Sequence, residues 1–214
     1  MTTPTTLRRA ATTVCIAGLA LAATATAITP AQAALPTPIS AATARSYLSG
    51  MSASAETHGD SYDRDLFPTW ITISGTCDTR EWILKRDGTG VTTNSACTAT
   101  SGTWTSAYDN AVTTNPSTFD IDHVVPLSEA WASGAWAWTT TRRRAFANDV
   151  TAPQLIAVSA SSNRSKGDKD PAEWLPQASY RCTYARAWVQ VKHDYALTVD
   201  ATEKSALTTL LNAC

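Results

Sequence analysis

The sequence contains little charge, and neither sign is in large excess. Charged residues make up only 16% of the 214 residues, and the formal net charge is −1 at pH 7. Bulk positive charge therefore cannot be what attracts this chain to an anionic partner. A collagen-like or heptad composition is also absent, and a hydrophobic fraction of 43% excludes a disordered chain. The length suits one domain that is large enough to close a real core.

Histidines and closely spaced cysteines are scarce as well. The chain has only His58, His123 and His193, which are too few and too badly spaced for a three-histidine zinc site. No C-x-x-C pair occurs, which argues against a four-thiolate zinc site. The sequence shows no internal repeat, helix-turn-helix or zinc finger, so any contact with nucleic acid is expected mainly at the phosphate backbone.

The first 33 residues have the three parts of a secretory signal peptide. Arg8 and Arg9 precede an apolar run over residues 10–28, and residues 31–33 (A-Q-A) offer a small-residue cleavage site. We therefore predict that residues 1–33 are removed and that the mature protein is secreted and free of a membrane anchor. The loss of two arginines lowers the formal net charge from −1 to −3. Residues 34–55 are expected to form a linker and an N-terminal helix, and residues 56–214 a single domain.

Four cysteines remain in the mature chain: Cys77, Cys97, Cys182 and Cys214. In an exported protein four cysteines are expected to form two disulfides, for which three connectivities exist. We predict the local pairing, Cys77 with Cys97 and Cys182 with Cys214. Each bond would close a modest loop, and the second would tie the last residue to the fold.

Hydrophobic periodicity predicts a mixed α+β fold. The N-terminal helix is expected over residues 41–52, with Ala44, Leu48 and Met51 on one face. Strands are expected at residues 70–73, 81–84, 91–93, 119–125 and 155–158. Ser159 or Ser161 can cap a short helix that Gly167 ends. Further helices are expected around residues 139–148, 184–191 and 200–211, the last opening with a capping box of an aspartate and a glutamate.

Charge is unevenly distributed along the chain. Residues 56–129 sum to −7, and residues 142–192 sum to +5. The second segment could therefore bind a polyanion locally even though the total charge is negative. Its basic residues are Arg142, Arg143, Arg144, Arg164, Lys166, Lys169, Arg181, Arg186 and Lys192.

Asp122 and His123 stand side by side, shortly before Pro126. Neighbouring residues on a strand point to opposite faces, but the end of a strand before a proline relaxes that rule. An adjacent carboxylate and imidazole can then serve one site. The carboxylate would be a hard oxygen ligand for a metal ion, and the imidazole would be a base.

A second polar segment lies at residues 163–168 (N-R-S-K-G-D). The amide oxygen of Asn163 and one carboxylate would leave most positions on a divalent cation open to water and substrate, which is how Mg²⁺ is usually held. Arg164 and Lys166 beside such an ion suit a phosphate group.

Together these segments resemble the HNH, or ββα-metal, endonucleases, and most closely a branch of secreted bacterial HNH-family proteins. The resemblance is carried by residues 122–126 (D-H-V-V-P), 155–158 and 163–168, with weaker similarity at 62–64, 77–80 and 173–176. D-H-x-x-P alone would be weak evidence. The same motif followed 40 residues later by N-R-x-K-G-D, after a β-prone run, is specific.

The resemblance implies a ββα-metal core with an N-terminal strand-rich extension and C-terminal helices. It makes His123 the general base and Asp122 and Asn163 the ligands of one divalent ion, Mg²⁺ or an alternative such as Mn²⁺. The amide that orients the base falls at Gln154, and Asn148 is the nearest asparagine, so either could hold the imidazole. With an ordinary pKa for His123, activity should rise through about pH 6–7.

Phosphate contacts are expected from Arg164 and Lys166, and from Arg80 by the resemblance alone. The implied function is hydrolysis of phosphodiester bonds of DNA, or also RNA, by a monomer with little sequence specificity. One alternative is an inactive HNH-fold protein that binds nucleic acid or the cell wall, which the departure at Gln154 would favour. A metallohydrolase acting on a phosphorylated polysaccharide is another.

Three tryptophans, Trp131, Trp136 and Trp138, lie close together in a segment that is poor in charge. Aromatic rings can stack on unpaired bases. In an exported domain of this size, however, burial in the core or anchoring of a loop is the commoner role, because a tryptophan buries so much area. We therefore expect packing roles for all three.

Overall fold

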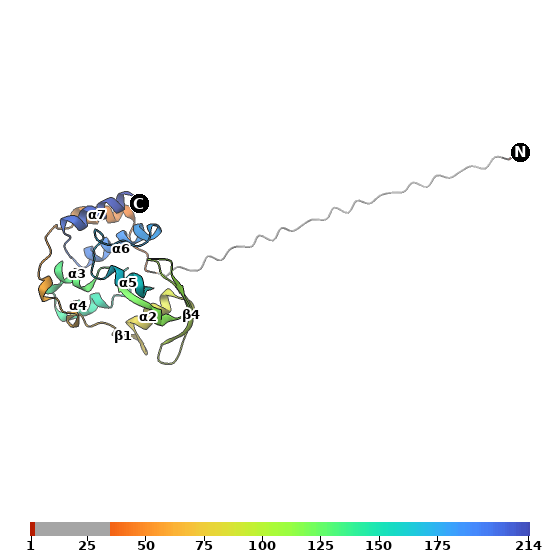
Figure 1. Cartoon of the computed structure of the whole chain (residues 1–214), viewed down its shortest axis with the longest axis horizontal. Coiled ribbons are helices and arrows are strands. Elements are labelled where there is room, and N and C mark those ends of the chain that lie inside the picture. The colour runs from red at the N-terminus through yellow and green to blue at the C-terminus, as the bar shows by residue number, and fades with distance from the viewer. Residues whose placement is uncertain (3–34) are drawn as a thin grey trace.

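The protein is described by a computed structural model that covers residues 1–2 and 35–214 (Figure 1). The signal peptide predicted over residues 1–33 therefore falls almost wholly outside the described residues. Within the described part, no helix is both long enough and apolar enough to cross a membrane.

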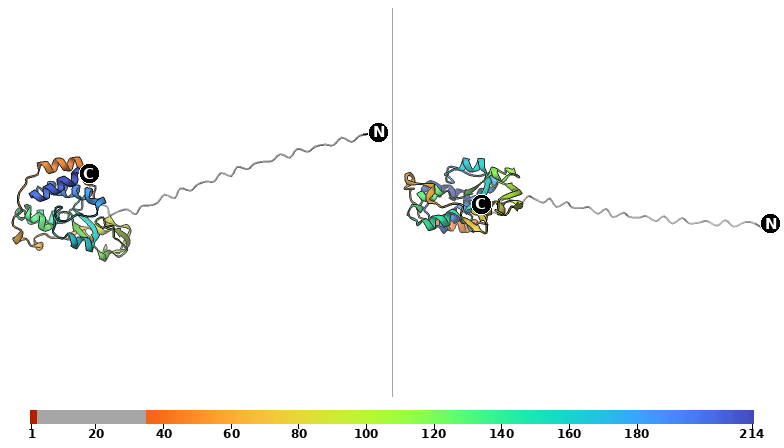
Figure 2. Two further views of the ribbon diagram at one scale, coloured as in Figure 1. Left: turned by 45° about the horizontal axis from the view of Figure 1, so that its top comes forward. Right: turned by 90° about the horizontal axis from the view of Figure 1, so that it is seen from below.

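A group of helices forms one end of the fold. The N-terminal helix α1 (Ala41–Gly50) packs against α6 (Arg181–Asp194) and α7 (Ala201–Asn212), and Figure 2 shows the orange α1 beside the dark-blue α7. The side chain of Ser40 caps α1, and Ala44 and Leu48 point into the core as predicted. The predicted capping box at the start of α7 is also confirmed, between Asp200 and Glu203. Helix α1 thus shares one core with the rest of the protein.

Short strands form the opposite end of the molecule. Strands β1 (Thr72–Ser74) and β2 (Cys77–Asp78) pair with each other, and β3 (Thr89–Thr93), β4 (Ala99–Thr105) and β5 (Val112–Thr113) form an antiparallel sheet. Short 3₁₀ turns connect the elements: η1 (Gly59–Ser61), η2 (Arg64–Leu66), η3 (Pro116–Thr118), η4 (Ala135–Ala137) and η5 (Ala178–Tyr180).

The strand predicted at residues 81–84 is wrong, because these residues lie in helix α2 (Thr79–Asp87). The β-prone run is overridden by a capping box in which Asp78 and Glu81 each bond the other's backbone N–H. Ile83 and Leu84 then face the buried ring of Trp104 from one side of the helix. Tertiary packing and the cap outweigh local strand propensity here.

A central hairpin consists of β6 (Phe119–His123) and β7 (Leu155–Ser159), which pair antiparallel with Asp122 opposite Ile156 and His123 opposite Leu155. Helices α3 (Leu127–Ala132) and α4 (Thr140–Ala147) lie between the two strands in sequence. Helix α5 (Ala160–Lys166) follows β7 directly. Ser159 caps it, and Gly167 ends it with a φ of 55°, as the sequence predicted.

The hairpin lies between two hydrophobic clusters. Alternation along its strands directs Phe119, Ile121, Leu155 and Ala157 towards the strand-rich end. Ile156 and Val158 pack instead into the larger helical core. Because both faces are covered, β7 is buried throughout, as its continuous apolar run predicted.

The predicted α+β class and both predicted disulfides are confirmed. Cys77 bonds to Cys97 and Cys182 bonds to Cys214, with Cα atoms 5.0 Å and 5.6 Å apart. The first bond joins β2 to the loop before β4. The second joins α6 to the C-terminus.

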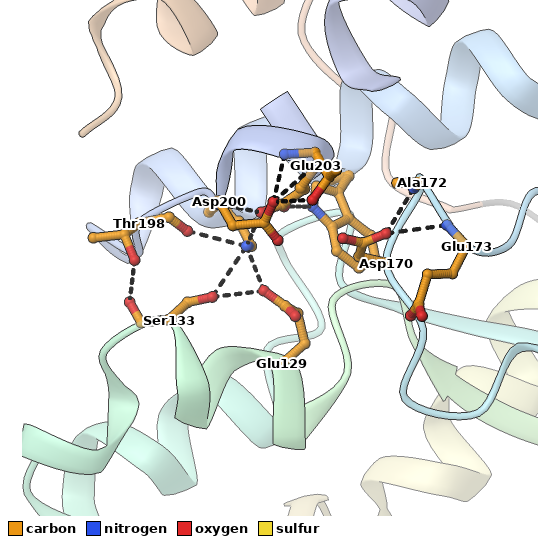
Figure 3. A network of polar contacts seen from close by, with 11 residues as sticks. Glu129, Ser133, Asp170, Ala172, Glu173, Thr198, Asp200 and Glu203 are labelled. Carbon is orange, nitrogen blue, oxygen red and sulfur yellow. Dashed lines mark hydrogen bonds and ion pairs between the residues drawn. The ribbon is translucent and has the colours of Figure 1, made fainter. Parts of the chain in front are cut away.

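A buried lysine connects the helices of the larger core. Lys192 on α6 is completely buried and donates hydrogen bonds to Glu129 of α3 and to Glu203 of α7. It also donates to Ser133 Oγ at 3.1 Å and to the Thr198 carbonyl at 3.0 Å. Figure 3 shows these acceptors converging from different segments on one amine.

Candidate active site

The carboxyl end of β6 and helix α5 form the wall of a pocket of about 240 Å³. The chain leaves the β6–β7 pairing after His123, and Ile121, Asp122 and His123 all line the pocket. Asn163 and Arg164 reach it from α5. The other lining residues are Tyr62, Arg64, Pro126, Leu127, Gly167 and Asp168.

His123 is buried and held in one tautomer. Its Nε2 lies 2.9 Å from the carbonyl oxygen of Ala147, which can only accept, so Nε2 carries the proton and Nδ1 keeps its lone pair. The pKa of His123 is lowered to about 4, first by burial and then by the nearby cations Arg64 and Lys166, against the opposing hydrogen bond to Ala147. The imidazole is therefore neutral at ordinary pH.

Asn148 supports the group that holds the imidazole. It does not contact the ring itself. Its Nδ2 donates to the carbonyls of Pro68 at 2.7 Å and Arg144 at 2.8 Å, and its Oδ1 accepts from Thr79 Oγ1 at 2.7 Å. These bonds fix the end of α4, where Ala147 lies. The expectation that a side-chain amide would bond the imidazole therefore differs from the structure, in which a backbone carbonyl does so.

Gln154 fixes the chain directly after His123. Its Oε1 accepts from the backbone N–H of Val125 at 3.1 Å, and its Nε2 donates to the carbonyl of Val125 at 2.9 Å. Its own carbonyl accepts from Val124 at 2.7 Å. Gln154, which directly precedes β7, thus continues the hydrogen bonding between the two strands beyond His123, the last paired residue of β6.

Asp122 is buried and bonded at both carboxylate oxygens. Oδ1 accepts from Lys166 Nζ at 3.0 Å and Oδ2 accepts from the hydroxyl of Tyr108 at 2.7 Å. Burial raises the pKa of Asp122, while Lys166 and Tyr108 act against that rise. Each carboxylate oxygen has a further lone pair beyond the one used here.

Lys166 and Arg80 do not lie where phosphate contacts were expected. Lys166 is completely buried, because its position on the short α5 faces β6, and its Nζ also donates to the carbonyl of His123 at 2.9 Å. Arg80 donates to the carbonyl of Phe119 at 3.0 Å, at the start of β6, and does not line the pocket. Both cations hold the strand that carries the site.

Arg64 was missed as a site residue by the sequence reasoning. It lines the pocket and lowers the pKa of His123 through its charge, after the larger effect of burial. The only signal was the weak similarity at residues 62–64. Arg64 and Arg164 are the arginines at this pocket, and among the described residues neither side chain is tied to a carboxylate by an ion pair.

Asp120 orients the amide of Asn163. Asp120 Oδ2 accepts a hydrogen bond from Asn163 Nδ2 at 3.1 Å. With the amide nitrogen engaged, the Oδ1 atom of Asn163 is the end free to accept or to bind a cation.

The donor chemistry fits a weakly coordinated, hard divalent ion. Asp122 and Asn163 line the same pocket and offer carboxylate and amide oxygens, the ligands that Mg²⁺ takes while keeping several waters. Among the described residues, no group of three or more His, Cys, Asp and Glu side chains is arranged to hold a metal.

Comparison with known proteins identifies the family. Residues 78–210 match the model of the C-terminal domain of GmrSD restriction endonucleases, and the chain belongs to this family. The match spans β6, β7 and α5 and ends within α7.

A curated relative is an uncharacterized secreted protein of Arthroderma benhamiae. It is 54% identical over 196 residues, which cover 91% of this chain and 96% of the relative. The relative is a secreted protein, which confirms the predicted localisation. It is not bacterial, so the similarity extends beyond the bacterial proteins that the sequence resembles. No solved structure matches the chain.

Proposed function

We propose that the protein is a secreted, metal-dependent endonuclease of the HNH type that hydrolyses phosphodiester bonds of DNA or RNA with little sequence specificity. One observation carries the proposal. His123 holds a neutral imidazole with Nδ1 unprotonated, in a pocket that also receives Asp122, Asn163 and two arginines. The membership of the chain in a family of restriction-endonuclease domains supports the same conclusion.

His123 acts as the general base in this proposal. Nδ1 takes the proton of a water molecule as that water attacks phosphorus, and the carbonyl of Ala147 keeps the other nitrogen protonated throughout. Because burial lowers the pKa of His123 to about 4, the base is already neutral near pH 5. The rise in activity expected at pH 6–7 for an ordinary histidine is thus replaced by a plateau from about pH 5 upwards.

The metal ion would be held by the Asp122 carboxylate and the Asn163 amide oxygen, Mg²⁺ being the first choice and Mn²⁺ an alternative. When bound, it would offset negative charge on the phosphate and leaving oxygens. Lys166 and Tyr108 keep the Asp122 carboxylate fixed against the pocket wall, and Asp120 keeps the Asn163 oxygen free.

Arg64 and Arg164 are the phosphate contacts in this proposal. Both line the pocket, although Arg64 precedes the D-H-V-V-P motif in the sequence and Arg164 follows it. A guanidinium can bind two phosphate oxygens at once. The cations that the sequence had offered for this role bond elsewhere: Lys166 bonds Asp122 and the carbonyl of His123, and Arg80 bonds the carbonyl of Phe119.

The binding-only alternative loses its one supporting feature. Its argument was the glutamine at the position of the orienting amide. Gln154 bonds both backbone groups of Val125 and so fixes the strand end despite the departure. A monomer acting outside the cell stays our prediction for the working form.

The test is a plasmid-nicking assay on the mature, disulfide-bonded protein with Mg²⁺, with EDTA, and with His123→Ala. We expect EDTA to abolish nicking and His123→Ala to reduce it about 10²- to 10⁴-fold, the usual contribution of a general base. His193→Ala is the matched control, because this exposed histidine lies on α6 and does not line the pocket. Nicking that survives His123→Ala would refute the assigned base, and retention of DNA without nicking under any divalent ion would support the binding protein.

A further inference from the structure

Trp136 differs from its two neighbours in sequence. Trp131 is buried, and Trp138 is half-buried against Phe146, which confirms the packing roles expected for them. Trp136, in η4, is 42% exposed and lies outside the core, so of the two expected roles only the anchoring of a loop applies to it. Its ring stacks against the exposed ring of His58, with centroids 3.9 Å apart and planes 16° apart.

The partner ring is held in place by several bonds. The carbonyl of His58 accepts from Trp131 Nε1 at 2.9 Å, and the His58 ring bonds Thr57 Oγ1 at 2.9 Å. His58 also has a φ of 63°, a left-handed conformation that costs free energy in a residue other than glycine. Such a conformation persists only where surrounding contacts determine it, so the stack is preorganised.

The two stacked rings belong to segments that also line the active-site pocket. His58 precedes the single turn η1, and Tyr62, which follows that turn, lines the pocket. Trp136 follows helix α3, whose first residue Leu127 lines the pocket as well.

The charges around the stack favour a base over a phosphate. Residues 52–63 contain no lysine or arginine, and they include the acidic residues Glu56, Asp60 and Asp63. The segment therefore offers no cation to a phosphate, and what the stack itself can bind is the π-face of an uncharged base. Phosphate contacts are available at the pocket itself, from Arg64 and Arg164.

We propose that His58 and Trp136 form a stacking platform for an unpaired base of the substrate strand, outside the active-site pocket. The substrate class is then single-stranded nucleic acid or a locally unpaired end or loop. This inference rests on the proposed nuclease function for its effect on cleavage, although stacking itself is a binding property.

The experiment compares Trp136→Ala with the wild-type protein on a single-stranded DNA oligonucleotide, the same sequence as RNA, and a blunt DNA duplex. We expect KM for the single strands to rise about 5- to 150-fold with kcat little changed, the range for loss of one stacked base. KM for the duplex should stay the same. Trp136→Phe should restore most of the affinity, and His58→Ala should give a smaller loss.

Trp82→Ala is the matched control, because Trp82 is a half-buried tryptophan on α2 that lies outside the active-site pocket. It should leave KM unchanged. The loss in Trp136→Ala should also be equal at 50 mM and 200 mM salt, whereas the loss in Arg164→Ala should shrink as salt rises. Thermal unfolding of each variant separates loss of binding from loss of fold.

Binding measured by fluorescence anisotropy with EDTA present separates this inference from the nuclease proposal. If the wild type cleaves nothing but binds single strands, and Trp136→Ala abolishes that binding, the platform stands and the nuclease proposal fails. A change of less than twofold in single-strand binding would overturn the platform. An equal loss on single strands and duplex would overturn it too, because a duplex offers no unpaired base.

Discussion

Two lysines of this protein are completely buried with carboxylate partners, and their surroundings differ. Lys166 bonds one carboxylate, Asp122, which forms part of the pocket wall. Lys192 bonds two, Glu129 and Glu203, inside the helical core (Figure 3). The first pair is balanced in charge, and the second group has an excess of negative charge.

Both lysines support the same stretch of chain. Asp122 stands at the start of the D-H-V-V-P motif, and Glu129 lies three residues after the motif ends. Lys166 therefore anchors the strand that enters the motif, and Lys192 anchors the helix that leaves it. The comparison shows how two buried lysines hold the chain on both sides of His123, although neither of them bonds the imidazole ring.

The negative excess around Lys192 changes the protonation of its partners. Burial raises the pKa of Glu203 to about 7, with Lys192 opposing and Glu129 adding to the rise. A hydrogen bond with Glu129 is the first cause that raises the pKa of Glu56 to about 8. Lys192 in turn helps to lower the pKa of Glu129 against its burial. Near pH 6 the network is thus one lysine, one ionised glutamate and protonated neighbours.

The largest effect is expected for Lys192→Met. Removal of the ammonium leaves the buried, ionised Glu129 and the partly ionised Glu203 without a counter-charge, which typically costs about 3–5 kcal/mol of unfolding free energy. Urea denaturation at pH 7 measures the loss. Lys169→Met is the control, because Lys169 is exposed and its amine donates to the backbone carbonyl of Ser165 and not to a carboxylate. Its stability should stay within about 0.5 kcal/mol of the wild type. A loss below about 1 kcal/mol for Lys192→Met would mean that the network is not ionised as described.

A second prediction concerns stability at acidic pH, to which the buried His123 beside the pocket contributes. In the folded protein the pKa of His123 is lowered to about 4, whereas a solvated histidine in the unfolded chain has a pKa of about 6.5. Between pH 6.5 and 4, therefore, His123 is protonated in the unfolded chain but not in the folded one. Its contribution to the free energy of unfolding falls as the pH drops through this range. The depressed pKa corresponds to about 3 kcal/mol. Because other groups also titrate in this range, the measurement is a difference: in urea denaturation, the stability of the wild type relative to His123→Ala should fall by about this amount as the pH drops.

Local signals in the sequence predicted several parts of the fold. The capping box at Asp200 and Glu203, the helix stop at Gly167 and the apolar run of β7 all operate within a few residues, and the structure confirms each of them. The strand wrongly predicted at residues 81–84 had a local signal too, since Asp78 and Glu81 have capping-box spacing. In this segment the helix cap outweighs the strand propensity of the individual residues.

The candidate site could be predicted only in part, because much of it depends on tertiary contacts. The motif residues Asp122, His123, Asn163 and Arg164 do line one pocket. The group that holds the imidazole is the backbone carbonyl of Ala147, which no side-chain pattern can reveal. Whether a lysine on a short helix faces solvent or β6 depends on how the helix docks, which is why Lys166 was predicted as a surface contact.

The third prediction contrasts Lys166→Met with Lys192→Met. Asp122 lies at a pocket wall, keeps its bond from Tyr108 and can be compensated by water or a cation, so we expect a smaller loss of stability, about 1–3 kcal/mol. Activity should fall at least tenfold, with a changed Mg²⁺ concentration for half-maximal rate, because Asp122 and the backbone of His123 lose their anchor. Titration of Mg²⁺ in the nicking assay measures both. Equal activity per folded molecule in Lys166→Met and Lys192→Met would remove the distinction between the two lysines.

The smallest effect is expected from Glu203→Gln, and it concerns pH dependence. The pKa of Glu203 is raised from 4.5 to about 7, so its contribution to stability is complete below pH 4.5 and is lost as pH rises through 7. This slope opposes that of His123 between pH 4.5 and 6.5, so the wild-type stability should change little there and decline above. Glutamine cannot ionise, and its single acceptor oxygen can keep the bond from Lys192 or the bond from Trp188 but not both. In Glu203→Gln the decline towards pH 7 should therefore weaken while the acid limb of His123 becomes steeper, and thermal unfolding from pH 4 to 8 would show both changes. An unchanged profile would assign the decline to Glu56, whose carboxyl shares the hydrogen bond with Glu129.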